Sequence, residues 1–425
     1  MSDQAQPEGF DEAVPPGAFE VQEERRTSPV ELLWDLVFVF AVTQVTTLLA
    51  ANPTWSRFGE SMLVLALVWW AWSAFVWAAN AQATGSRTLR AYLLMSTVLI
   101  FVVGLALPQA FGREALLFTI AYAVVRFLHL ALYVDASRAG NASRSAIAGF
   151  GTTVIVGMAL LIAGAAFLHG WHRALLWTVA VVIDYAGPAW LTRERLRGLQ
   201  RVSVAHFAER YGSFVIICLG ESVVALGVGV GSSESTLTTA QVLGTTLALL
   251  IAVGMWWIYF DRFAERAAAR LREHEDPVLA AADGYSYIHL VIVAGIIIFD
   301  GGVKLVVHNS ATAPMPAPGR LLMCGGVAIF LLGLAGFRLR MFGEVSYGLL
   351  TVAAALMALY EWGGSLPAWA IGAGIAALVG AMCGFGSLAS TAPGAKAPAS
   401  GPRPGGAPPP GAPRAEAEVL GPAAD

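Results

Sequence analysis

Residues 30–51 read VELLWDLVFVFAVTQVTTLLAA, and this stretch decides the fold class. It is mainly apolar and carries two acidic residues near its start, and about 20 such residues in a helix cross the hydrocarbon core of a bilayer. Eleven further runs of similar character follow. Together they predict twelve membrane-spanning helices, at about residues 30–51, 59–79, 91–111, 114–135, 146–168, 172–191, 207–230, 239–260, 284–306, 320–338, 345–361 and 366–388.

The composition of the chain leads to the same class. Hydrophobic residues make up 57% of the chain and charged residues 13%, against about 25% charged residues in soluble domains. A deficit of charge suits a lipid solvent. The net charge is −3 and the basic residues form no stripe, so nothing indicates a nucleic acid partner. We predict an all-α polytopic membrane protein, without a large soluble domain, whose partner is the lipid bilayer.

The basic residues predict the orientation of the spans, because Lys and Arg are enriched in cytoplasmic loops. With the N-terminus inside, 19 of the 26 Lys and Arg residues fall in inside segments. The four that fall outside are Arg57, Arg113, Arg173 and Arg320. The remaining three lie within spans and are Arg126, Arg210 and Lys304. This distribution supports an even number of spans, with both termini inside.

The two ends of the chain differ from the membrane domain, which we place at residues 27–389. Residues 1–26 are acidic and polar, and residues 390–425 are rich in Pro, Gly and Ala. Neither end can bury enough apolar surface to offset chain entropy, so both are expected to be disordered. The N-terminal segment lacks the features of a cleavable signal peptide, so the first span is expected to act as an uncleaved signal anchor.

Similar residues recur in the two halves of the membrane domain. Glu31-Leu-Leu-Trp-Asp35 opens the first span and Glu209-Arg-Tyr-Gly212 opens the seventh. Trp pairs follow at Trp69-Trp70 in the second span and Trp256-Trp257 in the eighth. The pattern is typical of two six-helix parallel repeats. Alternatively, the Trp pairs belong to ordinary interfacial belts.

Charged residues within the spans are the candidate functional residues, because each costs about 2.5–3.5 kcal/mol at the centre of a membrane helix. Glu31 and Asp35 are four residues apart and share one helical face. They form either a proton or cation site or structural salt bridges to a neighbouring helix.

In the seventh span, His206, Glu209 and Arg210 lie at the start and Glu221 lies deeper. Arg210 and Glu221 are separated by about 16 Å of helix, which is too far for a direct pair. Glu221 therefore needs a partner on another helix, or a proton. It is the leading candidate for a functional carboxyl, with a packed structural carboxyl as the alternative.

Arg126 lies near the middle of the fourth span, where its guanidinium stays charged and needs an acidic partner. The candidates for this partner are Asp184, in the sixth span, and Glu221. Such a pair would either fix helix packing or clamp an anionic group of a substrate.

The ninth span carries three further polar residues. His289 is either a proton relay near neutral pH or a satisfied core histidine. Asp300 and Lys304 are four residues apart and are expected to neutralise each other.

No catalytic constellation is present in the sequence, which contains no GxSxG, HExxH or Walker motif. Cys218, Cys324 and Cys383 lie singly in apolar runs, a spacing that fits neither a zinc site nor a disulfide framework. We expect no enzyme activity, no metal and no cofactor.

Four groups of residues match a known family pattern. They are Glu31–Phe40, Pro108–Phe111, Glu209–Gly212 with Leu219–Ser222, and His289–Leu290 with Val293–Gly295. Together they resemble the bacterial low-temperature-requirement protein A family over about residues 27–345. The chain departs from the pattern at Leu33-Trp34, where two aromatic residues are expected. The resemblance implies an integral protein of the bacterial inner membrane. It implies no biochemical activity, because the family name refers to a growth phenotype.

Two hypotheses for the function follow. The first is a secondary transporter, with proton coupling through the intramembrane carboxyls, for an unknown small solute or ion. The second is a membrane scaffold, sensor or lipid-handling protein needed in the cold, in which the charges are interhelical pairs. The first expects carboxyls that converge on a cavity open to one side. The second expects each carboxyl to be sealed against Arg or Lys. The oligomeric state does not follow from the sequence.

Overall fold

The computed structural model describes residues 27–80, 82, 86–138, 144–187, 204–231, 238–307 and 314–390. The contacts divide the chain into two units, Met1–Gly384 and Phe385–Asp425, and the arrangement described below is that of the first unit. The ends predicted to be disordered lie outside the described residues, apart from Ser390.

The described residues are almost entirely helical and contain no strand beyond an isolated bridge between Pro314 and Pro367. The α-helices are α1 (Pro29–Ala51), α2 (Trp55–Asn80), α3 (Arg87–Ala106), α4 (Ala115–Arg138), α5 (Arg144–Phe167), α6 (Gly170–Ala186), α8 (Val204–Gly231), α9 (Thr239–Tyr259), α10 (Glu265–Arg272), α11 (Pro277–Ala281), α12 (His289–Val307), α13 (Ala317–Phe342), α14 (Tyr347–Trp362) and α15 (Ala368–Ser390). Short 3₁₀ turns form η1 (Leu107–Gln109) and η5 (Gly363–Ser365), and π-helical turns form η3 (Phe260–Ala264) and η4 (Ala282–Ile288).

Eight helical segments of the described chain are long and apolar enough to cross a membrane. They are Pro29–Ala51, Trp55–Asn80, Arg87–Gln109, Ala115–Arg138, Ile147–Phe167, Gln241–Tyr259, Pro277–Leu305 and Ala317–Phe342. The other four predicted runs are occupied by α6, α8, α14 and α15. The structure thus supports a polytopic helical membrane protein with at least these eight spans, while the count of twelve stays a prediction.

Local sequence sets several of the helix ends. Pro29 occupies the first turn of α1, where its missing N–H costs nothing, and the backbone N and Oγ of Ser28 both donate to Glu31 at 2.8 Å. Pro277 begins α11 in the same way, after the Asp276 carboxylate accepts from the Leu279 amide. Gly343 ends α13 in the left-handed conformation, with φ at 71°.

Exposed apolar side chains line the outer faces of the helices. On α3, Leu94, Val98, Phe101 and Leu105 recur at three- or four-residue spacing and are each about half exposed. Such a stripe would be a liability in water and is the expected surface towards lipid tails.

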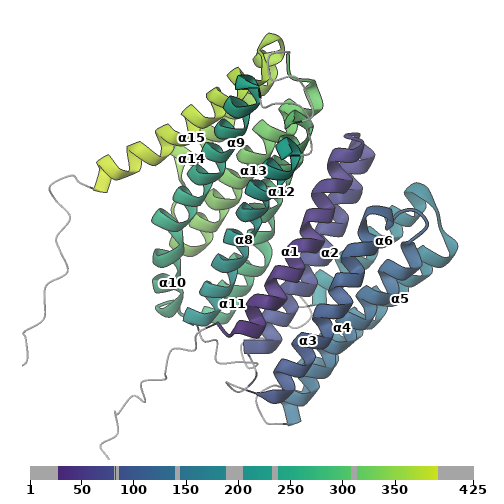
Figure 1. Cartoon of the computed structure of the whole chain (residues 1–425). Helices are drawn as coiled ribbons and strands as arrows, with labels where there is room; N and C mark the ends of the chain where they lie inside the picture. Colours follow the sequence, from purple (N-terminus) through teal and green to yellow (C-terminus); the bar gives the residue numbers. More distant parts are fainter. Residues whose placement is uncertain are drawn as a thin grey trace, which may run out of the picture. The chain divides into compact units, whose positions relative to one another are not determined.

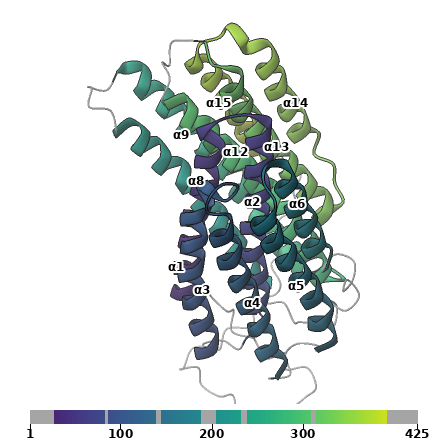
Figure 2. The ribbon, with the colours of Figure 1, turned by 90° about the vertical axis from the view of Figure 1, so that its right-hand side faces the viewer.

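The helices pack in two groups around α1 and α2, as Figure 1 shows. On one side α1 contacts α3, and α3 to α6 follow in series, each against the next, which can be traced in Figure 2. On the other side α1 contacts α8 and α12. The helices α1 and α8 each open one of the predicted halves, so their contact joins the two.

The helices α12 and α13 cross with their backbones in close approach, and glycines permit it. A Cβ at Gly295 would meet the backbone nitrogen of Phe330 and the carbonyl oxygen of Gly326, the latter at 2.8 Å. A Cβ at Gly326 would meet the backbone of Phe299 and the carbonyl oxygen of Gly295. Since the obstructing atoms are backbone atoms, no side-chain movement can relieve the clash.

We predict that Gly326→Ala lowers the stability of the protein by about 1–3 kcal/mol, because the added methyl group must push α12 and α13 apart. The matched control is Gly325→Ala, whose Cβ would meet only Leu321 Cδ1 at 3.7 Å. The midpoint of thermal unfolding in detergent should fall for the first variant and stay near that of the native chain for the second. Equal midpoints for the two variants would contradict the packing.

Candidate functional site

A buried ion pair joins the second turns of α1 and α8. Arg210 Nη2 lies 2.8 Å from Asp35 Oδ1, and both side chains are almost completely buried. Trp72 of α2 donates its indole N–H to the same oxygen at 2.8 Å. The guanidinium also lies over the ring of Trp34, 5.9 Å from its centroid. Asp35 thus links three helices.

One turn earlier, Glu31 contacts the same helix. His206 Nε2 lies 3.2 Å from Glu31 Oε1, and both side chains are 1% exposed. Glu31 and Asp35 therefore face α8 together, and each has its own partner there.

We predict that Arg210→Gln destabilises the protein by about 3–5 kcal/mol, because it leaves the Asp35 carboxylate buried without a cation. The double variant Asp35→Asn with Arg210→Gln should lose less, since neither charge remains. Thermal or denaturant unfolding in detergent measures both.

The control for this comparison is Arg338→Gln. It breaks an exposed pair, Arg338 with Glu344 at 2.7 Å, which should contribute only about 0–1 kcal/mol. If Arg210→Gln proved as harmless as Arg338→Gln, the buried pair would not hold α1 to α8.

A second buried ion pair joins α4 to α6. Arg126 Nη2 lies 2.8 Å from Asp184 Oδ1, and the side chains are 2% and 3% exposed. Of the two acidic partners considered for Arg126, the structure selects Asp184.

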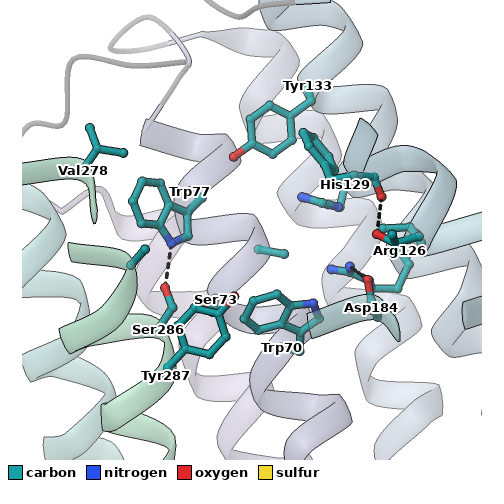
Figure 3. Close-up of a pocket in the computed structure, with 15 residues that line it drawn as sticks. Trp70, Ser73, Trp77, Arg126, His129, Tyr133, Asp184, Val278, Ser286 and Tyr287 are labelled. Carbon is teal, nitrogen blue, oxygen red and sulfur yellow. Dashed lines mark hydrogen bonds and ion pairs between the residues drawn. The ribbon is translucent and has the colours of Figure 1, made fainter. Parts of the chain in front are cut away.

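The pair lines a cavity of about 70 Å³, shown in Figure 3. One water needs about 10–15 Å³ by this measure, so several waters or a small solute fit. Further side chains come from α2 and α4 on one side and from α11 and η4 on the other: Trp70, Ser73, Trp77, His129, Tyr133, Val278, Ser286 and Tyr287. Trp77 Nε1 closes one wall by donating to Ser286 Oγ at 2.7 Å.

The cavity extends from the middle of α4 towards the C-terminal ends of α2 and α4. Arg126 is midway along α4, whereas Tyr133 and Trp77 lie near the C-terminal ends of α4 and α2, and Val278 lies in α11. In the predicted orientation these ends are cytoplasmic. The cavity therefore extends from the middle of the membrane domain towards the predicted inner side.

Glu221 pairs away from this cavity. Its Oε1 lies 3.5 Å from Lys304 Nζ of α12, so its partner is on another helix, as the spacing on α8 required. Lys304 and Asp300 do not form the expected direct ion pair in the described residues, since Asp300 accepts a hydrogen bond from Ser222 Oγ, and Lys304 acts on Asp300 only through its nearby charge. The reason is that α8 packs against α12 and presents Glu221 to Lys304 and Ser222 to Asp300.

Glu209 lies on the exposed face of α8, so the structure does not bring it next to the Arg210–Asp35 pair or the Glu221–Lys304 pair.

His289 is fully buried at the junction of η4 and α12. Its Nδ1 lies 2.9 Å from the Gly284 carbonyl, which can only accept, so Nδ1 carries the proton. Nε2 then accepts from the Tyr259 hydroxyl at 2.9 Å. With both nitrogens bonded and Tyr285 stacked on the ring, the structure gives His289 the contacts of a satisfied core histidine.

Sequence reasoning did not identify the aromatic wall of the cavity. Trp69, Trp70 and Trp72 are buried, whereas Trp256 and Trp257 are 41% and 46% exposed. The two Trp clusters therefore occupy different environments, and only the second resembles an interfacial belt. The signal available in the sequence was the density of Trp on one helix, from Trp69 to Trp77, which exceeds what one interface needs.

The comparisons with known proteins agree with this picture of a helical membrane domain. The family model for the bacterial low temperature requirement A protein matches residues 26–384. The chain belongs to this family. An uncharacterized protein of Rhizobium meliloti (strain 1021) is 32% identical over 316 residues, which cover 70% of this chain and 75% of that protein. Family membership and the apolar helices together indicate an integral, multi-pass membrane protein.

Within the family match lie all the buried pairs described above, from Glu31 to Lys304. The resemblance inferred from the short motifs is confirmed. The family description adds no reaction and no substrate, so the function has to be argued from the cavity.

Proposed function

We propose that the protein is a membrane transporter of a small polar solute, and that the cavity at Arg126 and Asp184 binds the solute. The observation that carries the proposal is a buried guanidinium–carboxylate pair lining a cavity between helices of the two halves of the chain. Charged groups that face a cavity within a membrane domain usually mark a substrate or ion pathway.

The chemistry of the cavity favours a solute that carries both an acceptor and a donor group. Arg126 Nε and Nη1 and Asp184 Oδ2 are buried and have no hydrogen-bond partner in the described part of the chain. The pair itself is neutral, so a zwitterionic or neutral polar solute adds no uncompensated charge. The rings of Trp70, Trp77 and Tyr133 suit an apolar portion of the same molecule.

The wider architecture that we propose is twelve spans in two six-helix halves, in the bacterial inner membrane. The contacts among the first five helices follow the same order in both halves, whereas α5 packs closely against α6 and α14 makes no comparable contact with α15 in the described residues. In the first half α1 contacts α2 and α3, α3 contacts α4, and α4 contacts α5. In the second α8 contacts α9 and α12, α12 contacts α13, and α13 contacts α14. This correspondence supports a repeat, although the two Trp clusters do not share an environment.

The experiment combines binding with flux. Purified protein is screened by thermal shift against zwitterionic, neutral, anionic and cationic small solutes. A ligand present at 100 times its Kd should stabilise by about 2.7 kcal/mol. Solutes that bind are then tested for uptake into proteoliposomes that contain a pH-sensitive dye.

We predict that the double variant Arg126→Gln with Asp184→Asn folds but loses the thermal shift and the uptake, because it preserves shape and leaves no unpaired charge. The control is Arg57→Gln, which alters a partly exposed pair with Glu60 on α2. A double variant that bound and transported like the native chain would exclude the cavity as the solute site.

A second candidate function is a scaffold, sensor or lipid-handling protein. One observation favours it: Asp35, Asp184 and Glu221 are each paired with Arg or Lys. On this view the ion pairs only fix helix packing.

Exchange of the charges, Arg126→Asp with Asp184→Arg, separates the two candidates. If the pair is only structural, the exchanged variant should recover stability and complement growth of a deletion strain in the cold. For a transporter we predict recovery of stability, measured by thermal unfolding, without recovery of solute binding or growth, because the donors no longer face the same part of the cavity. The single variants Arg126→Asp and Asp184→Arg each place two like charges in contact. They are expected to be destabilised and serve as the reference from which recovery of stability is measured.

A further inference from the structure

A second polar cluster, separate from the cavity, is buried where α1, α8 and α12 meet. It consists of Thr46, Glu221, Ser222, Asp300 and Lys304. Lys304 Nζ contacts Glu221 Oε1 and the hydroxyl of Thr46, and Ser222 Oγ donates to Asp300 Oδ1. Asp300 and Ser222 are fully buried, and the side chains of Glu221 and Lys304 are 8% and 19% exposed.

The cluster lies in the opposite half of the membrane domain from the cavity. Asp300 is seven residues before the end of α12, about 10 Å of helix, and Thr46 is five residues before the end of α1. Glu221 is ten residues before the end of α8. These three helices run in the same direction in the predicted orientation, so the cluster is nearer the outer surface.

The charges of the cluster do not balance unless a proton is bound. Two carboxyl groups face one ammonium group, and Lys304 already pairs with Glu221. Asp300 Oδ2 is buried and has no hydrogen-bond partner in the described residues, and no cation lies within ion-pair distance of either oxygen there. An ionised Asp300 would therefore be a desolvated negative charge whose one direct partner is a neutral hydroxyl.

Among the described residues, no positive charge other than that of Lys304 lies near enough to Asp300 to compensate it. The titratable groups that act on it are Glu221 and Cys218 from α8 and Lys304 from its own helix. Beside it, Gly301 and Gly302 pack against Leu49 of α1 and against Leu322 and Met323 of α13, which are all apolar.

We propose that Asp300 and Glu221 share Lys304 and together bind one proton, which is carried by Asp300 while Lys304 pairs with Glu221. Protonation forms one O–H bond on the Asp300 carboxylate and breaks one O–H bond of a hydronium ion from the aqueous phase, which becomes water. Lys304 is four residues after Asp300, so its ammonium can reach either carboxyl. Release of the proton from Asp300 leaves a carboxylate to which Lys304 can turn, and Glu221 then takes up a proton in its place.

This proton site stands independently of solute transport, whereas its use for coupling rests on the proposed function. The test therefore needs no substrate.

A protonated carboxyl group has a C=O stretch in the infrared that a carboxylate lacks. The full chain in lipid vesicles is measured at pH 7 and compared with Asp300→Asn. The variant should lose the band of one carboxylic acid and unfold at nearly the native temperature, because Asn resembles the protonated side chain.

The matched control is Asp261→Asn, an exposed residue, which should leave the band unchanged. Two further variants keep Asp300 in place. Ser222→Ala should move the band to higher frequency without removing it, because the carbonyl loses its hydrogen bond. Glu221→Gln should abolish the band at pH 7, because Lys304 can then turn from position 221 to pair with an ionised Asp300.

A band of unchanged area in Asp300→Asn would show that Asp300 is ionised and would overturn the proposal. So would a band that persists in Glu221→Gln, since the two carboxyls would then not share Lys304. If Asp300→Asn did not fold, the band in Ser222→Ala would decide, because only a protonated Asp300 responds to loss of that hydroxyl. Solute uptake can fail in every one of these variants without affecting the infrared result.

Discussion

A charge inside a membrane domain has to find a partner, and in this protein that constraint determines which helices touch. Asp35 and Arg210 are 175 residues apart in sequence, yet they form the contact that ties α1 to α8. Either group alone would be costly in an apolar interior, so the pair favours one arrangement of the two predicted halves. The pairs Arg126–Asp184 and Glu221–Lys304 act similarly, each between two helices.

The positions of the helices could be predicted because they depend on local information. A run of about 20 apolar residues, bounded by charge or by Pro and Gly, fixes a span almost by itself. The predicted run 284–306 nevertheless begins late, since the helical segment starts at Pro277 and passes through the π-helical turn η4. Asp276 and Pro277 mark that start, and a hydropathy pattern alone does not register them.

The ion-pair partners could be predicted only in part. Spacing along one helix excluded Arg210 with Glu221, and burial required a carboxylate for Arg126, which the structure supplies as Asp184. Spacing also suggested a pair between Asp300 and Lys304, but the approach of α8 gave Lys304 a different partner. Which helix approaches is a tertiary property and has no counterpart in the local pattern. For the same reason the aromatic wall at Trp70 and Trp77 could not be assigned to a cavity.

Helix α8 connects the features argued above to be functional. Near its start Arg210 pairs with Asp35. The next residue is Tyr211, whose hydroxyl oxygen lies 2.7 Å from Ser73 Oγ and 3.1 Å from Ser286 Oγ, and both serines line the cavity. Further along the same helix, Glu221 contacts Lys304 and Ser222 contacts Asp300 in the outer cluster. A helix transmits displacement along its axis because its backbone hydrogen bonds resist compression. A change of pairing in the outer cluster that moved α8 would therefore strain the hydroxyl contacts beside the cavity. Helix α8 thus connects the proposed proton-binding cluster directly to the proposed solute cavity.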